Sequence, residues 1–302
     1  MLICALTLSC IGAMLSACRE EGQQQPGKPD LPRVAAGAAL RDVTFFSNAL
    51  GREMTYRVFL PEKVAAGQKL PVVYLLHGNG GSFRDWSNYS DVSTYSAQGL
   101  ILVMPEGGSS YFINAVDRPR DKYEDYLTQD LIADVESRFP GISGRESRAV
   151  VGVSMGGFAA VKVGLSHPEL YVFAGAISPA IDVPERRFSW MRASQWSRFR
   201  SIFGPMGSKE RASRDPFALA QSADPRVTPL LYLTAGEQEP LRDPIARFAG
   251  RLRQRGFAFE FRTLRGFHDW NQWNAQIPGC FASLLPKLRP SLEQKSNRAA
   301  AK

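Results

Sequence analysis

The fold expected for this chain of 302 residues is decided by one stretch, Ala149-Val150-Val151-Gly152-Val153-Ser154-Met155-Gly156-Gly157. Its apolar first half is typical of a buried strand, and small residues and helix formers follow from Phe158 to Leu165. Between the two, residues 152–156 match the pattern G-x-S-x-G. A strand, a sharp turn and a helix are the setting in which this pattern exposes a nucleophilic serine. We therefore expect Ser154 in a strained turn, flanked by glycines because side chains there would collide with the neighbouring strand and helix.

The rest of the chain alternates apolar runs with segments of helical spacing. Strands are expected at 43–46, 54–60, 71–76, 100–104, 172–177, 229–234 and 258–264, and helices at 123–139, 241–252 and 270–288. The first two strands flank Asn48-Ala49-Leu50-Gly51 and are expected to form an antiparallel hairpin at a sheet edge. Strands that alternate with helices predict an α/β fold, with a mainly parallel sheet and helices on both faces.

Composition places the chain among soluble globular proteins, with 44% hydrophobic and 22% charged residues. The net charge is +8, carried mostly by arginine. A basic balance is compatible with nucleic acid or an anionic membrane surface as partner. Because no basic-aromatic nucleic-acid motif is present, we interpret the charge as a surface property and expect no nucleic-acid partner.

The N-terminus has the features of an export signal. Residues Leu2 to Leu15 are apolar but too short for a comfortable membrane span. The segment ends in Leu15-Ser16-Ala17-Cys18, which resembles a bacterial lipobox and implies that Cys18 carries a lipid in the mature protein. Arg19 follows it, and by resemblance to Gram-negative lipoproteins this favours the outer membrane. The alternative is an N-terminal hydrophobic helix that stays attached.

These features predict four segments along the chain. They are a signal peptide at 1–17, a flexible tether at 18–40, the folded domain at 41–290 and a disordered tail at 291–302. Cys4 and Cys10 would leave with the signal, so Cys280 is the one cysteine left in the domain and no disulfide is expected there. Cys280 lies in an apolar helical pattern and is expected in the core.

A nucleophilic serine in this turn requires an acid and a histidine, in the chain order serine, acid, histidine. The chain has three histidines, and His268 alone follows both the serine and the acid candidates, so we expect it to be the base. His77 precedes the serine, and His167 ends the predicted elbow helix. Three carboxylates follow the strand at 229–234, and the local pattern leaves open which is the acid: Glu237, Glu239 or Asp243.

Acyl transfer also requires N–H groups that bind the developing oxyanion. One is expected to be the backbone N–H of Met155, next to the serine. The other is expected in the glycine-rich stretch His77-Gly78-Asn79-Gly80-Gly81, with Asn79 as the first candidate and Gly80 as the second.

Five motifs occur together in one order along the chain. They are His77-Gly78-Asn79-Gly80-Gly81, Met104-Pro105-Glu106-Gly107-Gly108-Ser109-Ser110-Tyr111, Tyr123-Glu124-Asp125-Tyr126, Gly152-Val153-Ser154-Met155-Gly156-Gly157 and His268-Asp269-Trp270-Asn271-Gln272-Trp273. Together they resemble the esterase-D-like "putative esterase" family of α/β-hydrolases, and the resemblance covers Val43 to Leu288. It implies an α/β-hydrolase fold, no cofactor and no metal site, and a small-molecule or glycan-linked ester as substrate. In this family Glu124-Asp125-Tyr126 has a structural role.

The resemblance also favours one acid. The family often shows a glycine, two variable residues, an acid, one more residue and a leucine after this strand, and Gly236, Glu239 and Leu241 match with Glu in place of Asp. A serine carboxylesterase with Ser154, Glu239 and His268 as its triad is therefore expected. Two alternatives stay open: an acyltransferase of the mycolyltransferase type, and a non-catalytic envelope lipoprotein that binds glycan or ester ligands. S-formylglutathione hydrolysis is disfavoured, because that substrate is cytosolic and this chain is expected to be exported.

Residues 182–225 interrupt the alternation of strands and helices and are too long for an ordinary connection. We expect a partly helical insertion over the strand ends. Its aromatic side chains either line an acyl pocket or pack the insertion onto the domain: Trp190, Trp196, Phe199 and Phe203.

The lipobox resemblance generates a direct test. We expect Cys18→Ser to abolish labelling by fatty acid and to release the protein from the membrane fraction, because the lipid on this cysteine would be its anchor. Cys10→Ser is the matched control and should leave both unchanged, since Cys10 would be removed with the signal. Mass spectrometry of the native protein that shows an intact N-terminus at Met1 would contradict the prediction.

Overall fold

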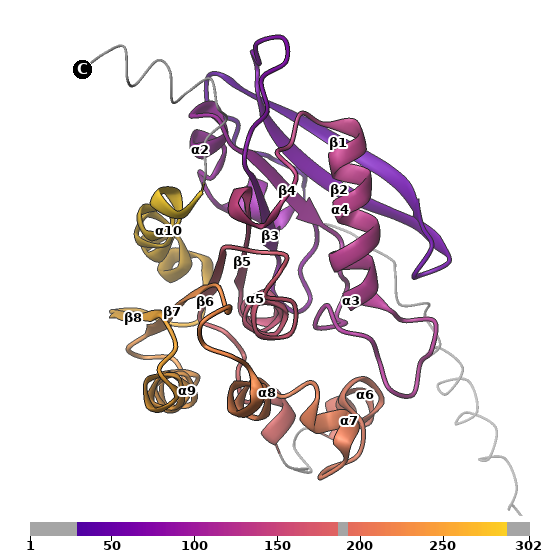
Figure 1. Ribbon diagram of the computed structural model, residues 1–302, viewed down its shortest axis with the longest axis vertical. Coiled ribbons are helices and arrows are strands. Elements are labelled where there is room, and N and C mark those ends of the chain that lie inside the picture. The colour runs from indigo at the N-terminus through magenta and orange to yellow at the C-terminus, as the bar shows by residue number, and fades with distance from the viewer. Residues whose placement is uncertain (1–28, 187–192, 289–302) are drawn as a thin grey trace, which may run out of the picture.

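The computed structural model describes residues 29–186 and 193–288. They form an eight-stranded sheet of order β1-β2-β4-β3-β5-β6-β7-β8, shown in Figure 1. The strands are β1 (Ala38–Ser47), β2 (Arg52–Pro61), β3 (Val72–Leu76), β4 (Ile101–Pro105), β5 (Arg148–Val153), β6 (Phe173–Ile177), β7 (Leu230–Gly236) and β8 (Phe259–Leu264). Only β2 runs antiparallel to its neighbours β1 and β4, and the strands from β4 to β8 pair in parallel. The predicted α/β fold and the predicted hairpin at the sheet edge are confirmed.

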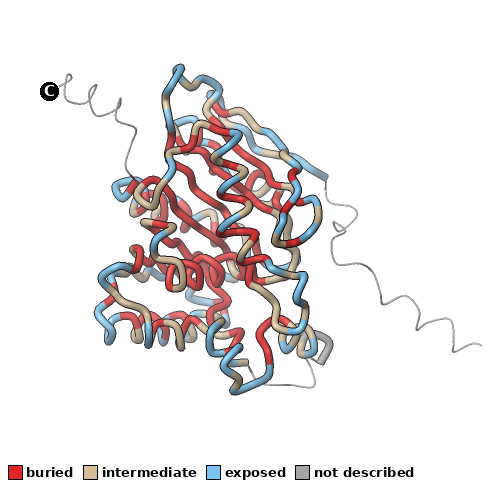
Figure 2. The backbone as a smooth tube through the Cα atoms, turned by 45° about the vertical axis from the view of Figure 1, so that its right-hand side comes forward, coloured by how far each residue is buried: buried red, intermediate tan, exposed pale blue. Residues whose placement is uncertain are grey.

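Helices cover both faces of the sheet. One face packs against α4 (Leu131–Arg138), α5 (Met155–Ser166), α8 (Pro216–Ser222) and α9 (Arg242–Arg255), and the other against α1 (Asp85–Tyr89), α2 (Ser93–Ala97) and α10 (Trp270–Leu284). Successive residues of a strand point to opposite faces, so Tyr74 and Leu76 join the first core while Val73 and Leu75 join the second. Figure 2 shows the resulting buried centre, with the exposed residues at its periphery.

Some helical segments differ from the prediction. The helix expected at 123–139 is divided into α3 (Tyr123–Asp125), a π-helical turn (Tyr126–Asp130) and α4. The short helices α1 and α2 were not predicted, because five residues are too few to show a helical period. Cys280 is fully buried in α10, as expected, and burial raises the pKa of its thiol. Among the described residues no helix is long and apolar enough to cross a membrane.

The folded domain begins before position 41, where the sequence placed its start. Strand β1 already begins at Ala38, and Asp30 forms an ion pair of 2.7 Å with Arg57, a side chain 2% exposed on β2. The N–H of Ala35 donates to Ser93 Oγ at 3.0 Å. A composition rich in proline and alanine does not reveal such contacts with distant residues. The expected signal peptide, residues 18–28 of the expected tether and the expected tail from 291 lie outside the described residues.

The insertion between β6 and β7 is partly helical, as expected. It contains a 3₁₀ turn (Val183–Glu185), α6 (Ala193–Phe203), α7 (Lys209–Ala212) and α8. Phe203 is fully buried and meets the rings of Tyr111 and Phe158 edge-on, at centroid distances of 5.3 and 5.7 Å. These contacts pack the insertion onto the domain, which was one of the two expected roles for its aromatic side chains. Trp190 lies outside the described residues.

The closest backbone approach around the predicted elbow lies where β5 turns into α5. A Cβ added at Gly152 would lie 2.2 Å from the carbonyl of Gly156 in the first turn of α5. A Cβ added at Gly156 would lie 2.2 Å from the carbonyl oxygen of Leu76, at the end of β3. The obstructing atoms are backbone atoms, so both positions require glycine for the reason predicted from the sequence.

This close approach generates a stability test. We expect Gly152→Ala to lower the free energy of unfolding by about 2 kcal/mol or more, because backbone atoms must move to admit the methyl group. The control is Gly250→Ala in α9, where an added Cβ meets nothing within 4 Å. It should raise stability by about 0.5–1 kcal/mol, since alanine favours the helix. Urea unfolding measures both, and a Gly152→Ala variant as stable as the wild type would refute the packing argument.

Candidate active site

Ser154 occupies the turn between β5 and α5 with φ +54° and ψ −111°, a backbone conformation that non-glycine residues rarely adopt. Its neighbours hold it there. The Ser154 N–H donates to the carbonyl of Ile177 at 2.9 Å, and the Ser154 carbonyl accepts from the N–H groups of Phe158 and Ala180, both at 3.0 Å. The strained turn predicted from G-x-S-x-G is therefore present.

His268 and Glu239 meet Ser154 from two other strand ends. His268 lies between β8 and α10, and its Nε2 is 2.9 Å from Ser154 Oγ. Glu239 follows β7, and its Oε2 is 2.8 Å from His268 Nδ1. The turn after β7 and the histidine loop are joined by the backbone, since the Gln238 N–H donates to the Gly266 carbonyl at 3.1 Å. The structure thus brings the three residues proposed from the sequence into one hydrogen-bonded chain.

The Glu239 carboxylate is fully removed from solvent, with a side-chain exposure of 0%. Its second oxygen, Oε1, accepts from the backbone N–H of Gly236 at 2.8 Å, so both oxygens have partners. A carboxylate only accepts hydrogen bonds, so His268 Nδ1 carries the proton and Nε2 is left to accept from the Ser154 hydroxyl. The other two acid candidates, Glu237 and Asp243, are exposed, and Asp243 lies in the first turn of α9.

The stretch from His77 to Gly81, called here the oxyanion loop, lies beside the nucleophile. A Cβ added at Gly78 would be 3.6 Å from Ser154 Cβ, so Asn79 follows directly on a residue whose backbone lies near the serine. The Gly81 N–H donates to the Gly78 carbonyl at 3.1 Å and closes the turn, while Asn79 is exposed. Met155 begins α5 next to the serine. The positions of Asn79 and Met155 suit the donor roles expected for them, which stay predictions.

The other two histidines have partners elsewhere. His77 is fully buried, with Nδ1 2.8 Å from the Gly78 carbonyl and Nε2 accepting from the Gly107 N–H at 3.0 Å. His167 ends α5, where its Nε2 is 2.8 Å from Glu124 Oε1. Glu124 also forms an ion pair with the buried Lys162. These contacts are consistent with a structural role for Glu124 and leave His268 as the histidine at the serine.

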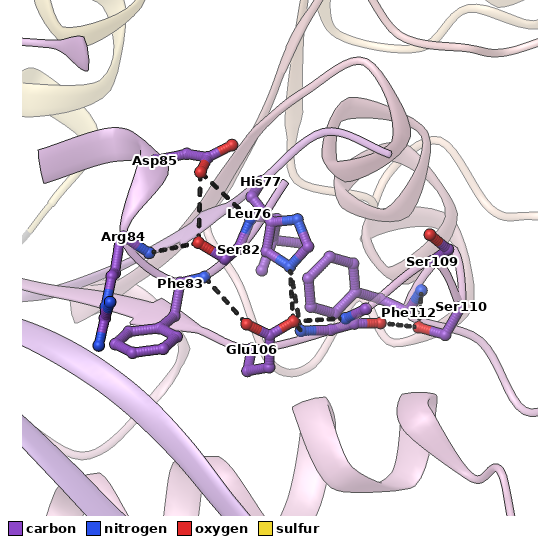
Figure 3. A network of polar contacts seen from close by, with 12 residues as sticks. Leu76, His77, Ser82, Phe83, Arg84, Asp85, Glu106, Ser109, Ser110 and Phe112 are labelled. Carbon is purple, nitrogen blue, oxygen red and sulfur yellow. Dashed lines mark hydrogen bonds and ion pairs between the residues drawn. The ribbon is translucent and has the colours of Figure 1, made fainter. Parts of the chain in front are cut away.

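Sequence reasoning missed the role of Glu106, which Figure 3 shows beneath the oxyanion loop. Its carboxylate accepts from the N–H groups of Phe83 at 3.2 Å and Gly108 at 2.7 Å and lies 3.6 Å from His77 Nε2. Burial alone would raise the pKa of Glu106, but His77 and the N–H donors outweigh it and the pKa is lowered. Burial likewise opposes charge on His77, yet Glu106 raises its pKa. His77 and Glu106 each lie in a glycine-rich motif of the sequence, but no local pattern indicates that the two motifs are in contact.

The site contains no evident metal ligands. Among residues 29–186 and 193–288, no group of three or more His, Cys, Asp or Glu side chains is arranged to hold a metal ion.

Comparison with known proteins identifies the family. The model of the family described as "Putative esterase" matches residues 47–284. An acetyl esterase of Caldicellulosiruptor saccharolyticus is 25% identical over 260 residues, which are 80% of this chain and 97% of that protein. An S-formylglutathione hydrolase from Agrobacterium tumefaciens has a similar fold, with a TM-score of 0.72, 20% identity and coverage of 86% of this chain and 99% of the other. A ferulic acid esterase gives a TM-score of 0.68 at 24% identity, with coverage of 80% and 96%.

The family match and the fold agree over the same part of the chain, from the hairpin to α10. The curated relative is matched along nearly its whole length, so the likeness is not confined to one motif. The chain belongs to the "Putative esterase" family and is a carboxylic ester hydrolase.

Proposed function

We propose that the chain is a serine carboxylesterase that works through an acyl-enzyme on Ser154. The observation that carries the proposal is the hydrogen-bonded chain from Ser154 Oγ to His268 to Glu239, with distances of 2.9 and 2.8 Å. It lies at a strained strand-to-helix turn, which exposes the hydroxyl to a substrate.

In the acylation step, Ser154 Oγ bonds to the ester carbonyl carbon while its proton passes to His268 Nε2. The carbonyl oxygen becomes an oxyanion, for which the N–H groups of Met155 and Asn79 are the proposed donors. The N-terminus of α5 adds its positive dipole end at the same place. The carbon–oxygen bond to the alcohol then breaks, and the alcohol leaves with the proton from Nε2.

In the deacylation step, water takes the place of the alcohol. His268 removes a proton from the water as its oxygen bonds to the acyl carbon, and the same proton returns to Ser154 Oγ when the carboxylic acid departs. Glu239 stays ionised throughout, fixes the imidazole in its tautomer and stabilises the imidazolium formed in each step.

The substrate we propose is a small-molecule or glycan-linked ester with a short acyl group. The support is the likeness to an acetyl esterase over 80% of the chain. A panel of p-nitrophenyl esters with acyl chains from acetate to palmitate tests this preference.

We further propose that the enzyme is exported and held at the bacterial envelope by a lipid on Cys18. The support is the lipobox-like sequence at 15–18. The described chain is held to the domain from Asp30 by its ion pair with Arg57. Positions 18 and 30 are twelve peptide units apart, so a lipid-anchored domain would stay within about 43 Å of the membrane surface.

Ser154→Ala tests the nucleophile. We expect the rate of ester hydrolysis to fall by about 10⁴-fold or more, because the acyl-enzyme can no longer form, while the unfolding midpoint stays near that of the wild type. Labelling by a fluorophosphonate probe should be lost in parallel. A folded variant that keeps more than about a tenth of the activity would overturn the assignment of Ser154.

The acid is tested by three variants measured side by side. Glu239→Gln should lower kcat by about 10²–10⁴-fold, because the amide no longer stabilises the imidazolium and favours the wrong tautomer. Glu237→Gln and Asp243→Asn are the matched controls and should each cost less than about tenfold, since both side chains are exposed. If Glu237→Gln or Asp243→Asn shows the large loss in kcat instead, the assignment of Glu239 as the triad acid is wrong.

A further inference from the structure

The side chain of Asn79 has a partner from the insertion. Its backbone N–H is the proposed oxyanion donor, so its side chain is available for another contact. Asn79 Oδ1 accepts a hydrogen bond of 3.2 Å from Nη2 of Arg198, which lies in α6. The two residues are 119 positions apart in the sequence. A residue of the insertion therefore contacts the oxyanion loop directly.

The same guanidinium also holds the loop that follows β4. Arg198 Nη2 donates to the carbonyl oxygen of Ser109 at 2.5 Å. This loop is rigidly built, because Ser110 Oγ donates to the Gly107 carbonyl at 2.7 Å and Glu106 accepts from the Gly108 N–H, as Figure 3 shows. Arg198 thus connects Asn79 to a fixed part of the molecule.

Glu106 accepts from the N–H of Phe83, two residues beyond the end of the oxyanion loop. Asn79 itself is exposed and follows the buried Gly78. The next residue, Gly80, is also exposed and has a φ of +75°, which marks a turn. The Gly81 N–H donates to the Gly78 carbonyl across this turn, and the side chain of Asn79 adds a second restraint on its position. A charge-assisted hydrogen bond from a half-buried arginine supplies that restraint.

We propose that Arg198 is a positioning residue, which holds the Asn79 N–H in the orientation that binds the oxyanion. The inference rests on the proposed function of Ser154 as nucleophile. Arg198 acts through Asn79 and does not touch the reacting atoms. Its effect is therefore on stabilisation of the transition state rather than on ground-state binding of the ester. The insertion becomes part of the catalytic machinery by this one contact, in addition to its aromatic packing.

The test is the kinetics of Arg198→Met, in which a side chain of similar length loses the donor. We expect kcat for p-nitrophenyl acetate to fall by about 10- to 100-fold, less than the 10²–10³ lost when an oxyanion donor is removed outright. KM should change by less than about threefold. Inhibition by phenylboronic acid, whose adduct on Ser154 is tetrahedral, should weaken by a factor similar to the loss in kcat. Arg198→Lys should recover part of the rate.

Two further variants separate positioning from folding. Arg200→Met changes the same charge at an exposed position of α6 and should behave as the wild type. Asn79→Ala removes the acceptor but keeps the backbone N–H, so it should reproduce the loss of Arg198→Met, and the double variant should be no slower than either single variant. If Arg198→Met does not fold, Asn79→Ala carries the test, because it alters only an exposed side chain.

The proposal is overturned if Arg198→Met or Asn79→Ala keeps kcat within about twofold of the wild type, or if the two losses multiply in the double variant. A rise in KM with kcat unchanged would also overturn it, since that result would assign Arg198 to substrate binding. Equal rates of ester hydrolysis for the wild type and Ser154→Ala would instead contradict the proposed function itself. Failure of the Arg198 proposal can therefore be told apart from failure of the assignment of Ser154 as nucleophile.

Discussion

The site depends on one constraint, which is the close contact of three backbone segments: the end of β3, the strand β5 and the first turn of α5. Gly152 and Gly156 bring these backbones so close that neither tolerates a Cβ. The turn between them forces Ser154 to a φ of +54°, which costs roughly 1–3 kcal/mol. The Ser154 N–H donates to the Ile177 carbonyl and the Ser154 carbonyl accepts from the Ala180 N–H, and these two bonds hold the strained residue in place. Since backbone atoms cannot rotate away, the backbone position of Ser154 is set before any substrate arrives.

The polar side chains of the site lie in loops at the ends of neighbouring strands. The carboxyl ends of β5, β7 and β8 lie at one edge of the parallel sheet, so the loops after them bring Ser154, Glu239 and His268 together. A fully buried carboxylate is costly unless it is paired, and Glu239 has both a backbone N–H and an imidazole as partners. Both partners hold the carboxylate against the His268 ring. The buried acid is both a structural element and a source of preorganised electrostatics.

The insertion between β6 and β7 packs onto the domain and also contacts the loops beside Ser154. Its Phe203 is held among the rings of Tyr111 and Phe158, and this packing places α6 beside α5 and the loop that follows β4. At that place Arg198 reaches both Asn79 and Ser109. A long connection that interrupts the alternation of strands and helices thus contacts the oxyanion loop directly.

The sequence by itself determined the α/β fold, the elbow at Ser154 and the choice of His268, because a strand–turn–helix pattern is local and the order of triad residues leaves one histidine. It narrowed the acid to three carboxylates that share the same chemistry within seven positions, 237 to 243. Family spacing favoured Glu239, and only the folded chain shows that Glu239 is buried against His268 while Glu237 and Asp243 are exposed.

Tertiary structure alone decided the rest. The domain starts earlier than composition suggested because Asp30 pairs with the buried Arg57. Glu106 and Arg198 bond to loops that are distant from them in sequence, Glu106 to Phe83 and Arg198 to Asn79. No local pattern marks such residues, since the free energy of a charged side chain depends on which groups surround it after folding, and a linear chain does not specify those neighbours.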